Sequence, residues 1–254
     1  TFGELAHDVL SAFGADARAA STDVGEIVRL LEELLEALVA DRFGKSARPA
    51  VAVQVAQLKL RLQAFARAQA AQAQAGWRIQ RTELEVKQAA CVLDVDGRPF
   101  HLVGRVDRID QNEITGEWAI WDYKTSDTAA KPEVTHRKGG EWIDLQLPLY
   151  RRLAAAVVEP MASILEVDGR VQLGYVQLPK SLDAIRFETA DWTAADLQAA
   201  DERARDVVRA LREQVFWPPA DPPPKFSEDL AGICLDGVFG RRPPSPEGDD
   251  EEGA

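Results

Sequence analysis

The sequence predicts an α/β protein with a central sheet, helices around it and a helical elaboration near its N-terminus. The first observation is a stripe of apolar residues with helical spacing, at Ile27, Leu30, Leu31, Leu34, Leu35 and Leu38. The second is a change to strand-like alternation after Trp77, and the third is a return to helical spacing after Asp144. Helices and strands that mix in this way along one chain are typical of the α/β class.

Helices are predicted for most of the chain before Trp77. They cover residues 2–13, 24–43 and 50–75. Ser21, Thr22 and Asp23 can cap the second helix, and Gly76 ends the third. Because the leucine stripe of the second helix indicates core packing, we expect residues 21–76 to form a helical wall beside the sheet.

A meander of strands is predicted next. Its strands cover residues 78–95, 99–110 and 117–124. Asp96 and Gly97 form a tight turn after the first strand, and the polar segment 111–117 connects the second strand to the third. The segment 128–141 contains Pro132 and a glycine pair, so we expect it to be a mobile loop over the site.

The remaining elements are a helix, a strand and a last helix. They cover residues 144–158, 171–178 and 191–216. The sequence then reaches a proline-rich stretch and the acidic segment 241–254, which we expect to be disordered.

The strand 117–124 is unusual because its apolar run ends in two charges. Successive side chains alternate between the faces of a strand, so Asp122 and Lys124 share one face and Tyr123 points to the other. Asp107 lies near the end of the preceding strand, and antiparallel pairing would bring it close to Asp122. Since burying either charge alone is costly, we expect a metal-bound carboxylate beside a lysine that handles a water or a phosphate oxygen.

Four short blocks resemble the motifs of one nuclease family. Gly104–Asp107 (G-x-x-D) and Asp122–Thr125 (D-Y-K-T) resemble the core of PD-(D/E)xK nucleases of the RecB and AddB exonuclease type. Gly3–His7 matches the N-terminal G-x-x-x-H motif, and Gln146–Tyr150 matches the Q-x-x-x-Y motif. The resemblance implies a three-layer α/β/α core like that of restriction endonucleases, with a central mixed sheet, in a nuclease domain that we place at residues 1–240.

The resemblance also implies roles for the charged residues. Asp107, Asp122 and the main-chain carbonyl of Tyr123 would bind Mg²⁺ or Mn²⁺, and His7 would be a further metal contact. Lys124 would orient or activate the attacking water and offset charge in the transition state.

Two questions about the site stay open at this level. Glu83 resembles the glutamate that precedes the G-x-x-D strand, but Glu85 shares its strand face, so either of them could complete the site. Gln146 and Tyr150 share one helical face and could reach a phosphate or a base near the metal, with Pro148 in the first helical turn.

Basic residues cluster around the motifs although the net charge is −12. This charge argues against a protein that coats DNA nonspecifically. The residues that could line a phosphate groove are Arg105, Arg108, Lys124, Lys131, Arg137, Lys138, Arg151 and Arg152. Of these we expect Arg105, Arg108 and Arg151 to contact DNA together with Gln146 and Tyr150. Pairing with Asp110 is the alternative for Arg108, and His136 is interpreted as incidental to the site.

The cysteine content and the hydropathy indicate in which cellular compartment the protein works. Cys91 and Cys234 are far apart, which predicts neither a zinc site nor a disulfide framework and favours a reducing, cytoplasmic location. They cannot supply the four ligands of the iron–sulfur cluster that some relatives carry, and we expect Cys234 to be a buried structural thiol. No apolar run is long enough for a membrane helix.

Together these observations predict a metal-dependent DNA nuclease. We expect an exonuclease module that acts on single strands beside a helicase domain or subunit, in recombination or double-strand-break repair. Since the chain begins at Thr1, with the first motif close behind, we also expect it to be part of a longer polypeptide. The alternatives are a catalytically silent DNA-binding or scaffold module of the same fold, and a Cas4-like nuclease, which the missing cluster cysteines disfavour.

Overall fold

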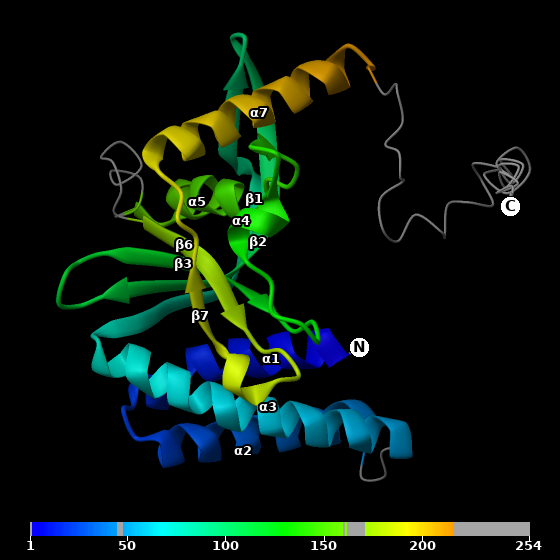
Figure 1. Cartoon of the computed structure of the whole chain (residues 1–254), viewed down its shortest axis with the longest axis vertical. Helices are drawn as coiled ribbons and strands as arrows, with labels where there is room; N and C mark the ends of the chain where they lie inside the picture. The colour runs from blue at the N-terminus through cyan, green and yellow to red at the C-terminus, as the bar shows by residue number, and fades with distance from the viewer. Residues whose placement is uncertain (1, 45–47, 160, 162–170, 216–254) are drawn as a thin grey trace, which may run out of the picture. The chain divides into compact units, whose positions relative to one another are not determined.

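A five-stranded mixed sheet lies at the centre of residues 2–209 (Figure 1). The computed structural model describes residues 2–44, 48–159, 161 and 171–215. The chain divides into two compact units, residues 1–209 and 210–254, and the sheet belongs to the first. The end of the predicted domain at residue 240, Cys234 and the predicted disordered tail lie outside the described residues.

The order of strands in the sheet is β1-β2-β3-β6-β7. The strands are β1 (Trp77–Val95), β2 (Arg98–Asn112), β3 (Trp118–Lys124), β6 (Val171–Gln177) and β7 (Arg186–Thr189). All neighbours pair antiparallel except β3 and β6, which are parallel. This arrangement confirms the predicted fold class with its central mixed sheet, and β7 is an additional strand that the sequence pattern did not predict.

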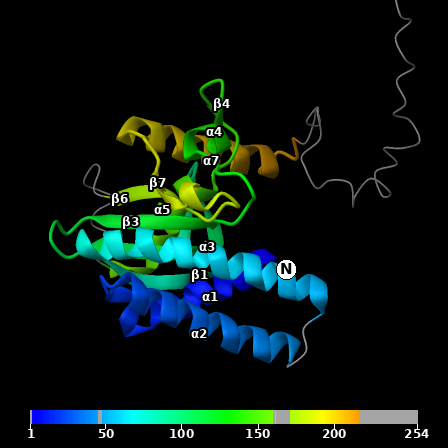
Figure 2. The same ribbon diagram turned by 60° about the horizontal axis from the view of Figure 1, so that its bottom comes forward.

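The N-terminal helices cover one face of the sheet (Figure 2). They are α1 (Phe2–Ala15), α2 (Val24–Phe43) and α3 (Pro49–Gln74), with the short 3₁₀ helix η1 (Ala17–Ala20) after α1. The Asp23 side chain accepts a hydrogen bond from Glu26 N and so caps α2. Phe13 of α1 and Phe65 of α3 meet edge to face, with ring centroids 6.0 Å apart, in the core between these helices and the sheet.

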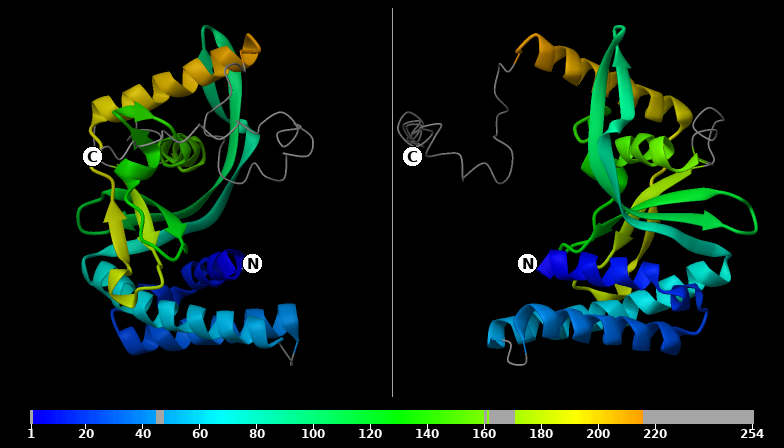
Figure 3. Two further views of the ribbon diagram at one scale, coloured as in Figure 1. Left: turned by 45° about the vertical axis from the view of Figure 1, so that its right-hand side comes forward. Right: turned by 180° about the vertical axis from the view of Figure 1, so that it is seen from behind.

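Helix α5 (Gln146–Val157) covers the opposite face of the sheet, which gives the three layers. Its Leu147 and Ala154 are fully buried against apolar residues of β2 and β3. Helix α7 (Ala194–Arg212) packs against the far end of the long β1–β2 ribbon, as the two views of Figure 3 show. None of the described helices combines the length and the apolar character that a bilayer-spanning segment requires.

The segment 128–141 is not the mobile loop that Pro132 and its glycine pair predicted. It contains helix α4 (Pro132–His136) and a two-stranded hairpin of β4 (Arg137–Lys138) and β5 (Glu141–Trp142). His136 and Trp142 are buried and contact the ring of Trp192, with ring centroids 5.4 and 4.9 Å away. These aromatic contacts span about fifty residues of sequence, and local composition cannot reveal them. The last short element, η2 (Leu182–Ala184), precedes β7.

Candidate active site

The candidate site lies where β2 and β3 part. Their pairing runs from Gln111 opposite Trp118 to Arg108 opposite Trp121. One residue further on, Tyr123 N donates a hydrogen bond of 2.9 Å to Asp107 Oδ2. The Asp107 carboxylate thus replaces a main-chain carbonyl as hydrogen-bond acceptor at the point where β2 and β3 stop pairing. This bond places Asp107 between the two strands.

Three potential metal ligands, one of which is Asp107, meet at this point. His7 Nδ1 lies 3.4 Å from Glu83 Oε1 and 3.7 Å from Asp107 Oδ2. The ligand atoms of all three residues lie within 4.8 Å of one another. Helix α1, β1 and β2 each contribute one of them. Two carboxylates with one imidazole form a donor set that fits a divalent cation.

Backbone geometry distinguishes Glu83 from Glu85. Glu83 has a φ of 46°, which is uncommon for a non-glycine residue, and lies between the register pairs Thr82–Arg108 and Leu84–Val106. Its side chain is partly buried in the cluster, whereas that of Glu85 is 69% exposed with its carboxylate 3.7 Å from Lys87 Nζ. The structure therefore brings Glu83, not Glu85, to the site. A strained backbone at such a position is common in functional sites.

Asp122 and Lys124 lie together on the other side of β3 from the Tyr123 side chain. Lys124 Nζ is 2.6 Å from Asp122 Oδ2 and 4.8 Å from the centre of the Tyr175 ring. The Tyr123 ring instead contacts the ring of His7, with centroids 5.6 Å apart. The alternation predicted for this strand is thus observed, and the predicted metal contact of the Tyr123 carbonyl stays a prediction.

The electrostatics of the site reflect a concentration of negative charge. Burial and the nearby Asp122 raise the pKa of Asp107 to about 6. Burial alone would lower the pKa of His7, but the hydrogen bond to Glu83 and the charges of Asp107, Glu83 and Asp122 outweigh it, so the pKa is raised. A divalent cation would relieve this repulsion.

Gln146 and Tyr150 approach the site from α5. Gln146 Nε2 lies 2.9 Å from Tyr150 Oη and donates a hydrogen bond to it. Burial, followed by the charges of Asp107 and Asp122, raises the pKa of Tyr150.

Two hollows flank the strand that carries Arg105. One, of about 310 Å³, is lined by Leu102, Val103, Gly104, Arg105, Gln146, Leu149, Tyr150 and Leu153. The other, of about 750 Å³, is lined by Glu83, Glu85, Val86, Lys87, Val103, Gly104 and Arg105. Arg105 belongs to both, its side chain is 65% exposed, and its Nε lies 2.8 Å from Glu83 Oε2. Of the predicted DNA contacts, it is thus a cation that remains accessible beside the cluster.

Arg108 is not available to bind DNA, and that prediction is wrong. Its side chain is 1% exposed and donates two hydrogen bonds, of 2.7 and 2.8 Å, to the carboxylate of Asp110. Trp121 Nε1 donates a third to the same carboxylate at 3.2 Å. The alternative, an ion pair between Arg108 and Asp110, is confirmed. This part of β2 is a central strand covered on both faces, so its charges must find partners inside the protein.

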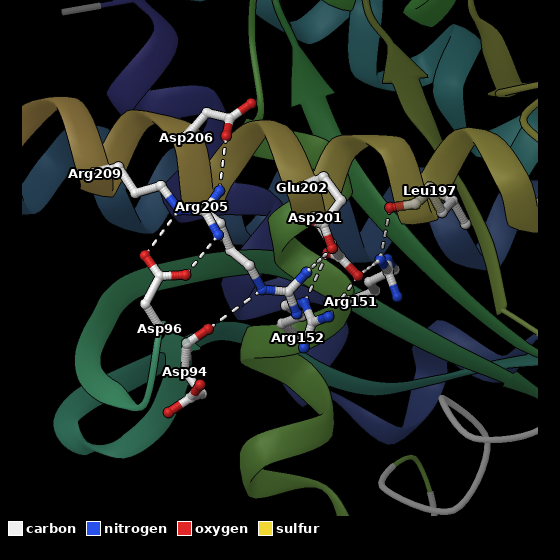
Figure 4. Close-up of polar contacts among 10 residues, drawn as sticks. All are labelled: Asp94, Asp96, Arg151, Arg152, Leu197, Asp201, Glu202, Arg205, Asp206 and Arg209. Carbon is white, nitrogen blue, oxygen red and sulfur yellow. Dashed lines mark hydrogen bonds and ion pairs between the residues drawn. The ribbon is translucent and has the colours of Figure 1, made fainter.

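Arg151 and Arg152 both form ion pairs inside the protein (Figure 4). The prediction that Arg151 contacts DNA is therefore wrong. Both arginines bind the buried carboxylate of Asp201 on α7, and Arg151 also donates to the carbonyl of Leu197 at 3.0 Å. Burial lowers the pKa of Arg151. These contacts join α5 to α7, and Arg209 of α7 likewise pairs with Asp96 in the turn between β1 and β2.

Arg61 of α3 supports the site and was missed by the sequence analysis. Its guanidinium is buried and donates to the carbonyls of Thr125, at 2.8 Å, and Leu178, at 2.9 Å. Its Nη2 also lies 2.7 Å from Asp127 Oδ1. Arg61 therefore fixes the chain just after β3 and β6. The available signal was a lone arginine on the apolar helical stripe that contains Leu58 and Leu62.

Comparison with known proteins agrees with this geometry. The family model for the PD-(D/E)XK nuclease superfamily matches residues 1–234. A search of curated proteins found no match. Because the matched region covers most of the chain and includes every residue of the candidate site, the chain belongs to the PD-(D/E)XK nuclease superfamily, whose members are nucleases that use divalent metal ions.

Proposed function

We propose that this protein hydrolyses phosphodiester bonds of DNA with Mg²⁺ or Mn²⁺ held by His7, Glu83 and Asp107. The observation that carries the proposal is the convergence of their ligand atoms within 4.8 Å. Asp122 precedes Tyr123, whose main-chain N–H binds Asp107, and its charge raises the pKa of Asp107, so we include it in the site. The cation would polarise the scissile phosphate and lower the pKa of the attacking water.

The protein's own groups would share the remaining work. The ammonium of Lys124, held by Asp122, would orient the attacking water and offset the negative charge of the transition state. Arg105 would contact a phosphate next to the scissile one, because it is exposed and its guanidinium lies beside Glu83. Gln146 and Tyr150 would contact the substrate from α5.

We further propose a single-stranded substrate. The hollow of about 310 Å³ has apolar walls, from Leu102, Leu149 and Leu153, next to the polar side chains of Gln146 and Tyr150. An unstacked base of a single strand can enter such a space, whereas a base in a duplex stays in its stack.

The wider role rests on the resemblance of the four sequence blocks to the RecB and AddB type. On that basis we propose an exonuclease module within residues 1–240 that works in the cytoplasm beside a helicase domain or subunit, in recombination or double-strand-break repair. A silent scaffold of the same fold is the rival proposal.

The test compares wild type with Lys124→Ala on end-labelled linear and on circular single-stranded DNA, with Mg²⁺ or Mn²⁺ supplied. We expect cleavage of linear DNA by wild type, and about a hundredfold to a thousandfold less by the variant. Lys87→Ala is the matched control, because Lys87 pairs with the exposed Glu85 on the same ribbon. Equal rates for wild type and Lys124→Ala would contradict the proposal. DNA binding without cleavage by wild type would support the scaffold, and cleavage of circular DNA would exclude a purely exonucleolytic mode.

A further inference from the structure

A buried histidine lies between the strand of Lys124 and the helix of Gln146. His136 ends α4, and its side chain is 1% exposed. It contacts two groups that the proposed chemistry does not use, the Tyr175 hydroxyl and Asp144. The segment in which it lies connects β3 to α5, and these two elements carry the D-Y-K-T and Q-x-x-x-Y blocks.

The partners of His136 determine which ring nitrogen carries the proton. Nδ1 lies 3.0 Å from the main-chain oxygen of Asp144 and 3.3 Å from its Oδ1. A carbonyl oxygen can only accept, so the neutral ring carries its proton on Nδ1. Nε2, which lies 2.6 Å from Tyr175 Oη, then accepts the hydrogen of the hydroxyl. The hydroxyl is thereby held in one direction, and the ring of Tyr175 is fixed with it.

The ring of Tyr175 packs against the ammonium group of Lys124. Tyr175 is the register partner of Asp122 on the neighbouring parallel strand, so its side chain lies next to that of Asp122. Lys124 Nζ lies 2.6 Å from Asp122 Oδ2 and 4.8 Å from the centre of the Tyr175 ring. The ammonium therefore has a carboxylate as one neighbour and an aromatic face as the other, an arrangement that favours a cation.

His136 also reaches the second sequence block through Asp144. The Asp144 carboxylate accepts a hydrogen bond of 2.7 Å from Gln146 N, at the start of α5. Gln146 Nε2 in turn donates to Tyr150 Oη at 2.9 Å. One series of contacts therefore runs from Lys124 through Tyr175, His136 and Asp144 to Gln146.

We propose that Tyr175 and His136 are positioning residues for the reaction. They hold the ammonium of Lys124 and the first turn of α5 in fixed places on either side of the site. This inference rests on the proposed function of Lys124. It predicts that their loss lowers the rate of hydrolysis and leaves DNA affinity nearly unchanged, because both side chains are buried and present no surface to DNA.

The first test reads the position of Lys124 without using activity. Reductive ¹³C-methylation of lysines keeps their positive charge, and a methyl group over an aromatic ring shows an upfield ring-current shift. We expect such a signal from Lys124 in wild type, and its loss in Lys124→Arg would assign it. The signal should move to the ordinary position in Tyr175→Leu. It should be displaced less in Tyr175→Phe, which keeps the ring but cannot bond to His136. A Lys124 signal that is unshifted in wild type, or unchanged in Tyr175→Leu, would overturn the proposal.

The second test measures single-turnover cleavage of single-stranded DNA with Mg²⁺, and DNA affinity with Ca²⁺. We expect the rate of Tyr175→Leu to fall by roughly tenfold to a hundredfold at unchanged affinity, since small displacements of catalytic groups have effects of this size. Tyr175→Phe should lose less. Val176→Ala, which removes buried atoms from the opposite face of β6, controls for general loosening of the strand.

An equal loss of rate in Val176→Ala and Tyr175→Leu would contradict a positioning role, as would a loss of DNA affinity that matches the loss of rate. Failure of the proposed function itself would look different. In that case Lys124→Ala would cleave DNA as wild type does, while the ring-current signal of Lys124 would still report on its contact with Tyr175.

Discussion

Asp107 and Asp110 are both buried on β2, three residues apart, yet their surroundings are opposite. Asp110 accepts two hydrogen bonds from Arg108 and one from Trp121. Asp107 accepts one hydrogen bond, from Tyr123 N, and has further carboxylates nearby at Glu83 and Asp122. Its pKa is raised to about 6, with burial as the main cause.

The difference separates a structural carboxylate from one prepared for a ligand. The Asp110 carboxylate already accepts three hydrogen bonds inside the protein, so its geometry is fixed and it is not available to a new partner. A buried carboxylate with too few donors remains able to bind a cation, at the expense of stability in its absence. The contrast predicts that removing each group has an opposite effect on folding.

Asp110→Ala should have the largest effect on stability. The substitution leaves the guanidinium of Arg108 buried without its carboxylate, which costs about 3 to 5 kcal/mol. Urea unfolding would measure the change. The double variant Arg108→Met with Asp110→Leu is the control, because it removes both charges and should recover most of the loss. A small effect of Asp110→Ala alone would mean that water or another group replaces the carboxylate.

Glu83→Gln should lower the cleavage rate by about a hundredfold, whereas Glu85→Gln should leave it unchanged. The reason is that only Glu83 lies in the cluster with His7 and Asp107. Initial rates at saturating Mg²⁺ and Mn²⁺ would measure the effect, and the two glutamates are matched controls for each other. Similar losses for the two variants would show that the contrast in their backbone geometry does not decide the chemistry.

Asp107→Asn should stabilise the metal-free protein while it abolishes cleavage. The folded pKa of about 6 lies above the ordinary 3.8, so the free energy of unfolding falls as pH rises from about 4 to 6 and stays low above that. Asparagine removes this penalty, of about 1 to 3 kcal/mol, and can still accept the hydrogen bond from Tyr123 N.

Urea unfolding in the presence of EDTA, at pH 7.5 and at pH 4, would measure this gain. We expect it at pH 7.5 and expect it to vanish at pH 4, where Asp107 is protonated in the folded protein. A loss of stability at pH 7.5 would show that Asp107 is as well satisfied as Asp110.

The same contrast, between a charge held by partners inside the protein and a charge that stays available, applies to two arginines. Arg105→Ala and Arg151→Ala should have the smallest effects of the variants considered. Arg105 is exposed beside the site, so its loss should weaken DNA binding and reduce the salt dependence by about one phosphate contact. Arg151 is held by Asp201, so its loss should lower stability and leave the salt dependence unchanged. Fluorescence anisotropy with Ca²⁺ over a range of salt concentrations would test both, and an equal change in the two slopes would contradict the assignment.

Much of the site follows from short-range rules. The face shared by Asp122 and Lys124 follows from strand alternation, and the approach of Asp107 follows from the hairpin between β2 and β3. The start of α2 follows from its Asp23 cap. Each of these features depends on residues a few positions apart, or on one tight connection.

The rest depended on contacts between distant residues. A positive φ at Glu83 breaks the alternation that made it equivalent to Glu85. Arg151 forms an ion pair with Asp201, about fifty residues further along the chain, and is therefore not available to bind DNA. Arg108 is buried because β2 is a central strand. The sequence by itself therefore determined the fold class and the residues at the ends of the central strands. Only the tertiary structure decided which charges remain available, because burial and ion pairing are set by packing between elements that no local pattern specifies.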